Sequence, residues 1–233
     1  MMMTWKVTKT TPKSVTHWDR LFHHIAEAIG ADFKAGVNQI LPGAEGGDAP
    51  FRVLVSTLIS LRTRDEVTIP ASRRLLAEAP DARSLAELSE ARIQELIYPA
   101  GFYKNKAKNL KEIGRRLAAQ EGGVVPNTRE RLTELPGVGP KTANLVLGLG
   151  FGIEAICVDT HVQRIPNRLG WISTRTPEES EAALMQILPR KFWIPINQLL
   201  VGFGQQICTP VSPRCGVCPL AGECPRIGVA HHR

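Results

Sequence analysis

The chain has 233 residues, 43% of them hydrophobic, which suffices for one large domain or two small ones with a real core. Lys and Arg outnumber Asp and Glu by 29 to 22, and the resulting formal charge of +7 suits a polyanionic partner, although many basic proteins have none. No apolar run reaches the roughly 18 residues of a membrane span, and no secretory signal begins the chain, so we expect neither membrane insertion nor export.

The N-terminal half is predicted to be helical. Apolar residues recur at helical spacing, or fill a whole segment, in five stretches, residues 18–29, 51–61, 66–79, 84–97 and 104–119, and the fourth stretch is expected to form one or two short helices. Asp65 is placed to cap the third of these helices. Residues 1–13 are expected to form a loose tail, and the glycine-rich residues 42–48 a loop.

Four cations follow one face of the helix predicted over residues 104–119. They are Lys104, Lys108, Lys111 and Arg115, at positions i, i+4, i+7 and i+11. Such a stripe is either a solvated surface or one wall of a nucleic-acid groove.

The central feature is the segment 135–144, Leu-Pro-Gly-Val-Gly-Pro-Lys-Thr-Ala-Asn, between two helix-like stretches, 129–135 and 141–149. Gly137 and Gly139 allow a tight turn with positive φ and no side chain to keep a ligand away. The amides of such a turn and the N-terminus of the following helix favour a phosphate. The segment therefore predicts a helix–hairpin–helix that grips a nucleic-acid backbone and presents Lys141 to it.

The C-terminal part is also predicted to be helical. Residues 162–169 have a helical pattern that Pro166 is expected to kink or to confine to short turns. Thr176 and Glu179 form a capping box that opens a helix over 178–188, and a last helix over 193–206 leads into the cysteines. Almost no stretch alternates with period two, so the predicted fold class is all-α.

Four of the five cysteines crowd into a Cys-x6-Cys-x2-Cys-x5-Cys pattern, formed by Cys208, Cys215, Cys218 and Cys224. Without an export signal, this pattern indicates a metal centre before disulfides. The spacing fits an iron–sulfur cluster, and zinc is the alternative. Cys157 stands alone in an apolar stretch and is expected to be a small buried hydrophobe.

The hairpin segment, the following Val158-Asp159-Thr160-His161-Val162 and the cysteine pattern together resemble the endonuclease III family of base-excision DNA glycosylases. The resemblance implies a six-helix barrel domain that holds the hairpin, over residues 44–153. It also implies a second helical domain, residues 1–43 and 154–233, that carries a [4Fe–4S] cluster on the four cysteines. Double-stranded DNA with a damaged base or an abasic site would lie in the groove between the domains.

The resemblance further implies the chemistry, removal of oxidised pyrimidines followed by cleavage of the strand. Lys141 would attack the sugar and form an imine, provided that burial or nearby cations favour its neutral amine. Asp159, eighteen residues beyond Lys141, would activate it or stabilise positive charge on the sugar, and is also placed to cap a helix. His161 would orient Asp159, contact a phosphate or serve only structure.

Some positions depart from the family pattern. Arg62 stands where a glutamine commonly fills the gap left by the flipped base, and Phe102 where a leucine often wedges the opposite strand, although Phe102 is also a candidate for core packing. Pro140 replaces a common basic residue, and Arg214 is the only cation in the loop between the first two cysteines. The expected DNA contacts are Gly137, Val138, Gly139, Arg62, Phe102, His161 and Arg214.

Two other functions stay open at this point. One is a mismatch-specific or adenine-removing glycosylase that uses water as nucleophile, and the other is a DNA-binding module without catalysis. Lys141 argues against the first, as does the absence of a carboxylate at Arg62 and Thr63. We expect a monomer in the cytoplasm, associated with the nucleoid.

Overall fold

The computed structural model describes residues 15–30, 33–34, 36–40, 49–120 and 122–233. The tail predicted over 1–13 and the loop predicted over 42–48 lie outside these residues. The described part of the chain contains α-helices, short 3₁₀ turns and one π-helical segment but no β-strand, which confirms the all-α prediction.

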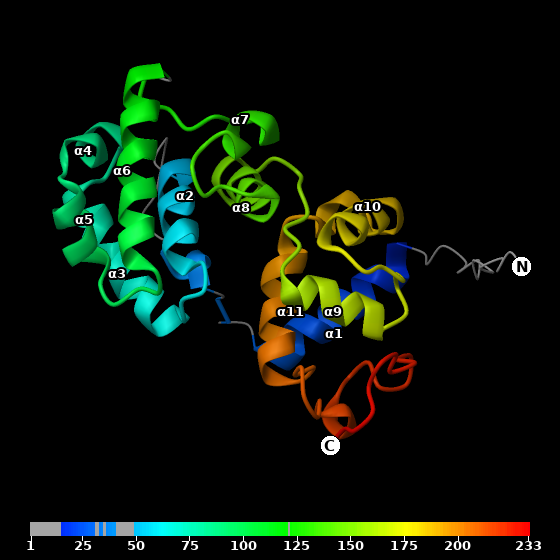
Figure 1. Ribbon diagram of the computed structural model, residues 1–233. Helices are drawn as coiled ribbons and strands as arrows, with labels where there is room; N and C mark the ends of the chain where they lie inside the picture. The colour runs from blue at the N-terminus through cyan, green and yellow to red at the C-terminus, as the bar shows by residue number, and fades with distance from the viewer. Residues whose placement is uncertain (1–14, 31–32, 35, 41–48, 121) are drawn as a thin grey trace, which may run out of the picture.

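The first group of helices encloses a core around α2. Its members are α2 (Ala49–Ser60), α3 (Asp65–Glu78), α4 (Ala82–Glu87), α5 (Glu90–Ile97), α6 (Tyr103–Gln120), α7 (Arg129–Thr133) and α8 (Pro140–Leu145), which the π-helical Val146–Gly150 extends. Helix α2 is apolar around most of its circumference because neighbours cover it on most sides, and Figure 1 shows α6 and α8 on either side of it. The hairpin between α7 and α8 is thus held by a packed core.

The second group combines both ends of the chain. It contains α1 (Val15–Ile29), α9 (Thr160–Arg168), α10 (Pro177–Ile187) and α11 (Pro195–Gln206), with the C-terminal segment below α9 and α11 in Figure 1. Aromatic rings join α1 to the rest of this group. Phe22 stacks on Phe192 with ring centroids 4.2 Å apart, and Trp18 meets Trp171 edge-on at 4.9 Å.

Two hydrophobic clusters underlie these groups. We therefore propose the division into a barrel domain and a domain made from both chain ends. One detail differs from the predicted boundary at residue 44. Val37 and Ile40 pack in the cluster of the first group, because the short 3₁₀ turn Gly36–Gln39 lies against α2 and α3.

Asp65 behaves differently from its prediction, and the chain at Pro166 remains helical. Asp65 is the first residue of α3, and its carboxylate accepts a hydrogen bond from the amide of Gly36 at 3.2 Å instead of capping the helix. Pro166 lies inside α9, which continues to Arg168. A proline removes only one amide donor, and close to the C-terminal end of a short helix that loss is tolerated.

Two of the four cations in the stripe on α6 form contacts within the protein. The Lys111 ammonium donates to the carbonyl oxygens of Ala86 and Leu88, both at 2.6 Å, where α4 ends. Arg115 pairs with Glu112 at 2.8 Å. These contacts favour the surface interpretation of the stripe over a nucleic-acid groove.

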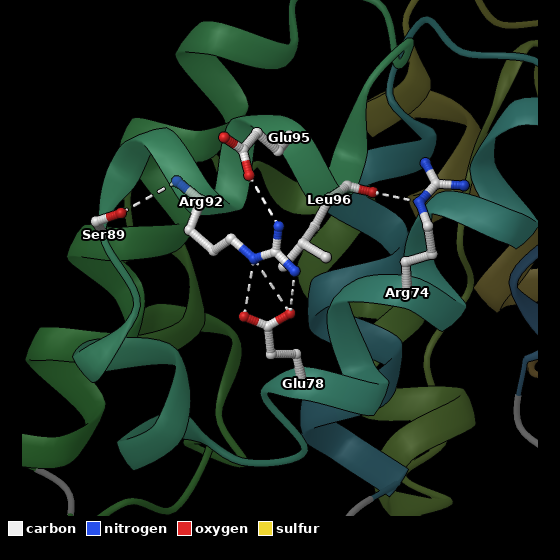
Figure 2. A network of polar contacts seen from close by, with 6 residues as sticks. All are labelled: Arg74, Glu78, Ser89, Arg92, Glu95 and Leu96. Carbon is white, nitrogen blue, oxygen red and sulfur yellow. Dashed lines mark hydrogen bonds and ion pairs between the residues drawn. The ribbon is translucent and has the colours of Figure 1, made fainter.

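A second polar network joins α3 to α5 on the surface (Figure 2). The Arg92 guanidinium donates to Glu78 and to Glu95, each as close as 2.8 Å, and Arg74 donates to the Leu96 carbonyl oxygen at 2.9 Å. The hydrogen bonds from Arg92 lower the pKa of Glu78. Exposed ion pairs add little stability, so the core beneath them holds these helices together.

Candidate active site

The two glycines of the hairpin have different roles. Gly137 has a φ of +80°, and a Cβ there would lie 2.6 Å from Asn109 Nδ2, so the turn itself requires glycine. Gly139 is the extended N-cap residue of α8 (φ −97°), and a Cβ on it would meet no atom of the described residues within 4 Å. Val138 between them is 6% exposed and anchors the turn in the core. Gly139 therefore leaves open space on the outer side of the hairpin.

Lys141 and Asp159 line the same two pockets. Lys141 is the second residue of α8 and is exposed, whereas Asp159 is half-buried directly before α9. Both residues and Thr160 contribute to a pocket of about 500 Å³ beside the hairpin and to one of about 220 Å³ on the side of α11. Among the described residues no carboxylate forms an ion pair with Lys141, so its amine is accessible from both pockets.

Asp159 is held by the helix that it starts. Its Oδ1 accepts hydrogen bonds from the amides of His161 at 2.8 Å and Val162 at 2.9 Å. A carboxylate at a helix N-terminus is stabilised by the helix dipole. Within the described part of the chain no hydrogen bond engages Oδ2, so one oxygen anchors the side chain and the other is left for the pocket.

His161 contacts Asp159 through its backbone amide, whereas its ring is hydrogen-bonded to Arg164. Arg164 donates to His161 Nδ1 at 3.2 Å, which makes that nitrogen the acceptor of a neutral ring. Burial lowers the pKa of His161; the charge of Asp159 opposes this shift, and nearby Arg164 and Lys141 add to it. The ring lies against Gly204, where a Cβ would approach Nδ1 to 2.1 Å. A neutral ring does not supply a charge to a phosphate, and the amide of His161 helps to orient Asp159.

Arg62 and Phe102, forty residues apart in the sequence, meet at a third pocket. Both adopt left-handed backbone conformations, with φ of +53° and +56°. The Arg62 guanidinium lies 5.6 Å from the centre of the Phe102 ring, a cation–π contact. Phe102 is 61% exposed, which excludes core packing. Lys141 also lines this pocket of about 460 Å³, so the predicted wedge residues lie beside the predicted nucleophile.

The four clustered cysteines line one pocket below α9 and α11. None of the described cysteines forms a disulfide, and no three described His, Cys, Asp or Glu side chains converge closely enough for one metal ion. The four thiols nevertheless line one pocket, and four cysteine thiols are the donor set that an iron–sulfur cluster takes.

Two arginines lie near this pocket, and the fifth cysteine is buried elsewhere. Arg168 Nη1 lies 3.6 Å from Cys208 Sγ, and exposed Arg214 lines the pocket next to Cys215. Cys157 is 3% exposed, and burial raises the pKa of its thiol to about 12. This confirms that Cys157 is a buried small side chain.

Glu181 and Asn144 are site residues that sequence reasoning missed. Glu181 Oε1 accepts from Arg129 Nη1 at 2.7 Å and from Asn144 Nδ2 at 2.8 Å, and Asn144 also donates to the Ile156 carbonyl oxygen at 2.9 Å. These bonds connect α7, α8, α10 and the segment before Asp159 behind the pocket that Glu181 lines. Asn144 belongs to the hairpin segment, but nothing in the pattern around Glu181 marks it, because its partners are distant in sequence.

Two family models match the chain. Residues 55–190 match the HhH-GPD superfamily of base excision DNA repair proteins, and residues 208–224 match the iron-sulfur binding domain of endonuclease III. The second match covers the four cysteines that line the common pocket.

Several relatives are similar over most of the chain. Endonuclease III of Thermotoga maritima is 50% identical over 175 residues, 75% of this chain and 82% of that protein. Endonuclease III homolog 2, chloroplastic, of Arabidopsis thaliana is 42% identical over 90% of this chain, and endonuclease III-like protein 1 of Gallus gallus is 45% identical over 75%. This chain spans 58% and 63% of the length of those two relatives.

Solved structures show the same fold. A trapped endonuclease III–DNA covalent intermediate superimposes with a TM-score of 0.75 at 29% identity, covering 92% of this chain and 97% of that one. A thermostable thymine-DNA glycosylase superimposes with a TM-score of 0.76 at 22% identity, over 89% and 95% of the two chains, which shows the fold alone.

Proposed function

Since this chain belongs to the endonuclease III family within the HhH-GPD superfamily of base excision DNA repair proteins, we propose that Lys141 and Asp159 carry out its reaction. The protein is a base-excision DNA glycosylase with abasic-site lyase activity, and its partner is DNA. Oxidised pyrimidines are the proposed substrates. The supporting observation is that Lys141 and Asp159 line two common pockets beside the hairpin between α7 and α8.

The proposed reaction starts from a nucleotide flipped out of the duplex, because C1′ is inaccessible inside the stack. The deprotonated Nζ of Lys141 forms a bond to C1′, and the base leaves with the electron pair of the glycosidic bond and gains a proton. The sugar ring opens to an imine with Lys141. The imine acidifies the C2′ proton, and its removal expels the 3′ phosphate by β-elimination, which cuts the strand.

Asp159 is proposed to act through its charge. Positive charge develops on the sugar as the base departs, and a carboxylate fixed beside it stabilises that charge without reorganising. The two amide bonds to Oδ1 supply the fixed position. This role does not require Asp159 to accept a proton, and deprotonation of the amine by Oδ2 is the alternative role for the same carboxylate.

Borohydride trapping tests the proposed function. A duplex with one thymine glycol, incubated with the protein and sodium borohydride, is expected to give a covalent protein–DNA adduct and, without borohydride, a cleaved strand. Release of the base without adduct or strand scission would instead indicate attack by water. A panel of duplexes, each with one defined lesion, tests the preference for oxidised pyrimidines.

Gly139→Ala is expected to weaken DNA binding about tenfold while the free energy of unfolding changes by less than about 0.5 kcal/mol. Its extended backbone accepts any residue and its Cβ position is empty, so the methyl group collides only with a docked DNA backbone. Fluorescence anisotropy with an abasic duplex and urea unfolding measure the two quantities. Unchanged binding would remove Gly139 from the DNA interface.

The protein holds a [4Fe–4S] cluster, and we propose Cys208, Cys215, Cys218 and Cys224 as its ligands. When bound, the cluster would tie residues 208–224 into one rigid loop. Cys215→Ser is expected to lose bound iron and to make the segment after α11 sensitive to protease, because one ligand bond and the order of the loop are lost together. Iron analysis and limited proteolysis are the measurements. The control Cys157→Ala is expected to keep its iron, and retention of iron by Cys215→Ser would contradict the assignment.

None of the described helices is long and apolar enough to cross a membrane. We further propose that the protein acts as a monomer on chromosomal DNA, associated with the nucleoid in the cytoplasm. The support is that one chain supplies both Lys141 and Asp159 and the hairpin beside them.

A further inference from the structure

Lys106 is a buried lysine whose ammonium group donates three hydrogen bonds within the protein. It lies on α6 and is 7% exposed. Its Nζ donates to the carbonyl oxygens of Ile59 and Leu61, both at 2.6 Å, and to Thr63 Oγ1 at 2.8 Å. An ammonium has three donors, so every proton has an acceptor. Lysine is almost never buried without such partners.

These acceptors surround Arg62. Ile59 belongs to the last turn of α2, where carbonyl oxygens lack helical partners and a cation is favourable. Leu61 and Thr63 directly flank Arg62, whose positive φ is costly for a residue other than glycine. Such a conformation persists only where its surroundings impose it, and Lys106 binds the chain on both sides of it.

The same bonds connect Arg62 to Phe102. Thr63 Oγ1, which accepts from Lys106, also accepts from the amide of Gly101 at 3.1 Å. A Cβ on Gly101 would lie 2.7 Å from the Arg62 carbonyl oxygen, so the two turns are in direct contact. Lys106, Arg62 and Phe102 then line one pocket with Lys141.

We propose that Lys106 is a positioning residue that holds residues 61–63 in the shape that presents Arg62 to the gap left in the duplex by the flipped nucleotide. The inference rests on the proposed function. Lys106 acts through Arg62 and does not replace Lys141 as nucleophile, because all its protons are engaged inside the protein. Burial lowers the pKa of Lys106 to about 8, which leaves the group mainly protonated at neutral pH.

A double-mutant cycle tests this role. Lys106→Met keeps the length of the side chain and removes its donors. Both Lys106→Met and Arg62→Ala are expected to lower kcat/KM on a lesion duplex about tenfold, mainly through KM. Both variants are expected to change the preference for the base opposite the lesion in the same way. The double variant Arg62→Ala/Lys106→Met is expected to have the same kcat/KM as Arg62→Ala alone. If Lys106→Met lowers kcat/KM by the same factor in the parent protein and in the Arg62→Ala variant, the proposal is overturned.

Lys111→Met is the matched control, because Lys111 makes the same kind of bonds from the same helix to the end of α4. It is expected to lower Tm to a similar extent while kcat/KM stays within about twofold. An equal loss of activity in this control would mean that loosening α6 is sufficient, and would overturn the proposal.

Thr63→Val serves if Lys106→Met does not fold, because it removes only the hydroxyl acceptor. It is expected to shift the opposite-base preference in the same direction by a smaller factor, and an unchanged preference would overturn the proposal. Borohydride trapping with the parent protein separates the two inferences. A parent that forms no adduct contradicts the proposed function, whereas a parent that traps DNA with an additive cycle contradicts only the role of Lys106.

Discussion

Replacing Lys141 by alanine is expected to abolish the borohydride-trapped adduct and to lower base release by at least about 10³-fold. The reason is that the amine is the only proposed atom that forms a bond to C1′, and the remaining hairpin contacts bind DNA without supplying a nucleophile. Trapping assays on thymine-glycol and abasic duplexes and single-turnover release of the base measure the two effects. Binding of the undamaged backbone is expected to fall by less than about tenfold, because the hairpin amides remain.

Lys191→Ala is the control for Lys141→Ala. Lys191 is exposed, forms an ion pair with Asp19 in the second group of helices, and lines none of the three pockets around Lys141. Its adduct yield is expected to equal that of the parent protein. If Lys141→Ala forms the adduct as well as the parent does, another amine is the nucleophile and the assignment fails.

Asp159→Asn is expected to lower the rate of base release by about 10² to 10³-fold with little change in stability. Asparagine caps a helix as well as aspartate does, so its Oδ1 keeps both amide bonds while the negative charge is lost. Single-turnover kinetics and thermal unfolding, measured on the same preparation, separate the two effects.

Asp159→Ala provides the comparison, because it removes the cap together with the charge. It is expected to be as inactive as Asp159→Asn and in addition less stable by about 1 kcal/mol. A fully active Asp159→Asn would show that Asp159 serves the protein only as a helix cap.

The sequence by itself determined the features that depend on neighbouring residues. Helical periodicity placed the helices, the capping box at Thr176 formed as predicted, and no described residue is in a strand. The hairpin lies between α7 and α8 because Gly137 alone supplies the positive φ that its turn needs. The cysteine spacing similarly indicated one metal centre, since its four proposed ligands lie within a short segment.

Only the tertiary structure decided which distant residues share a surface. Asp65 looked like a helix cap but bonds Gly36, and Glu181 carried no sequence signal although it connects three helices. Lys106 could not be told from the other lysines of α6, because its acceptors lie more than forty residues earlier in the chain. Local propensity acts over one or two turns, whereas burial, charge pairing and the presence of Lys141 and Asp159 in the same pockets depend on how helices pack.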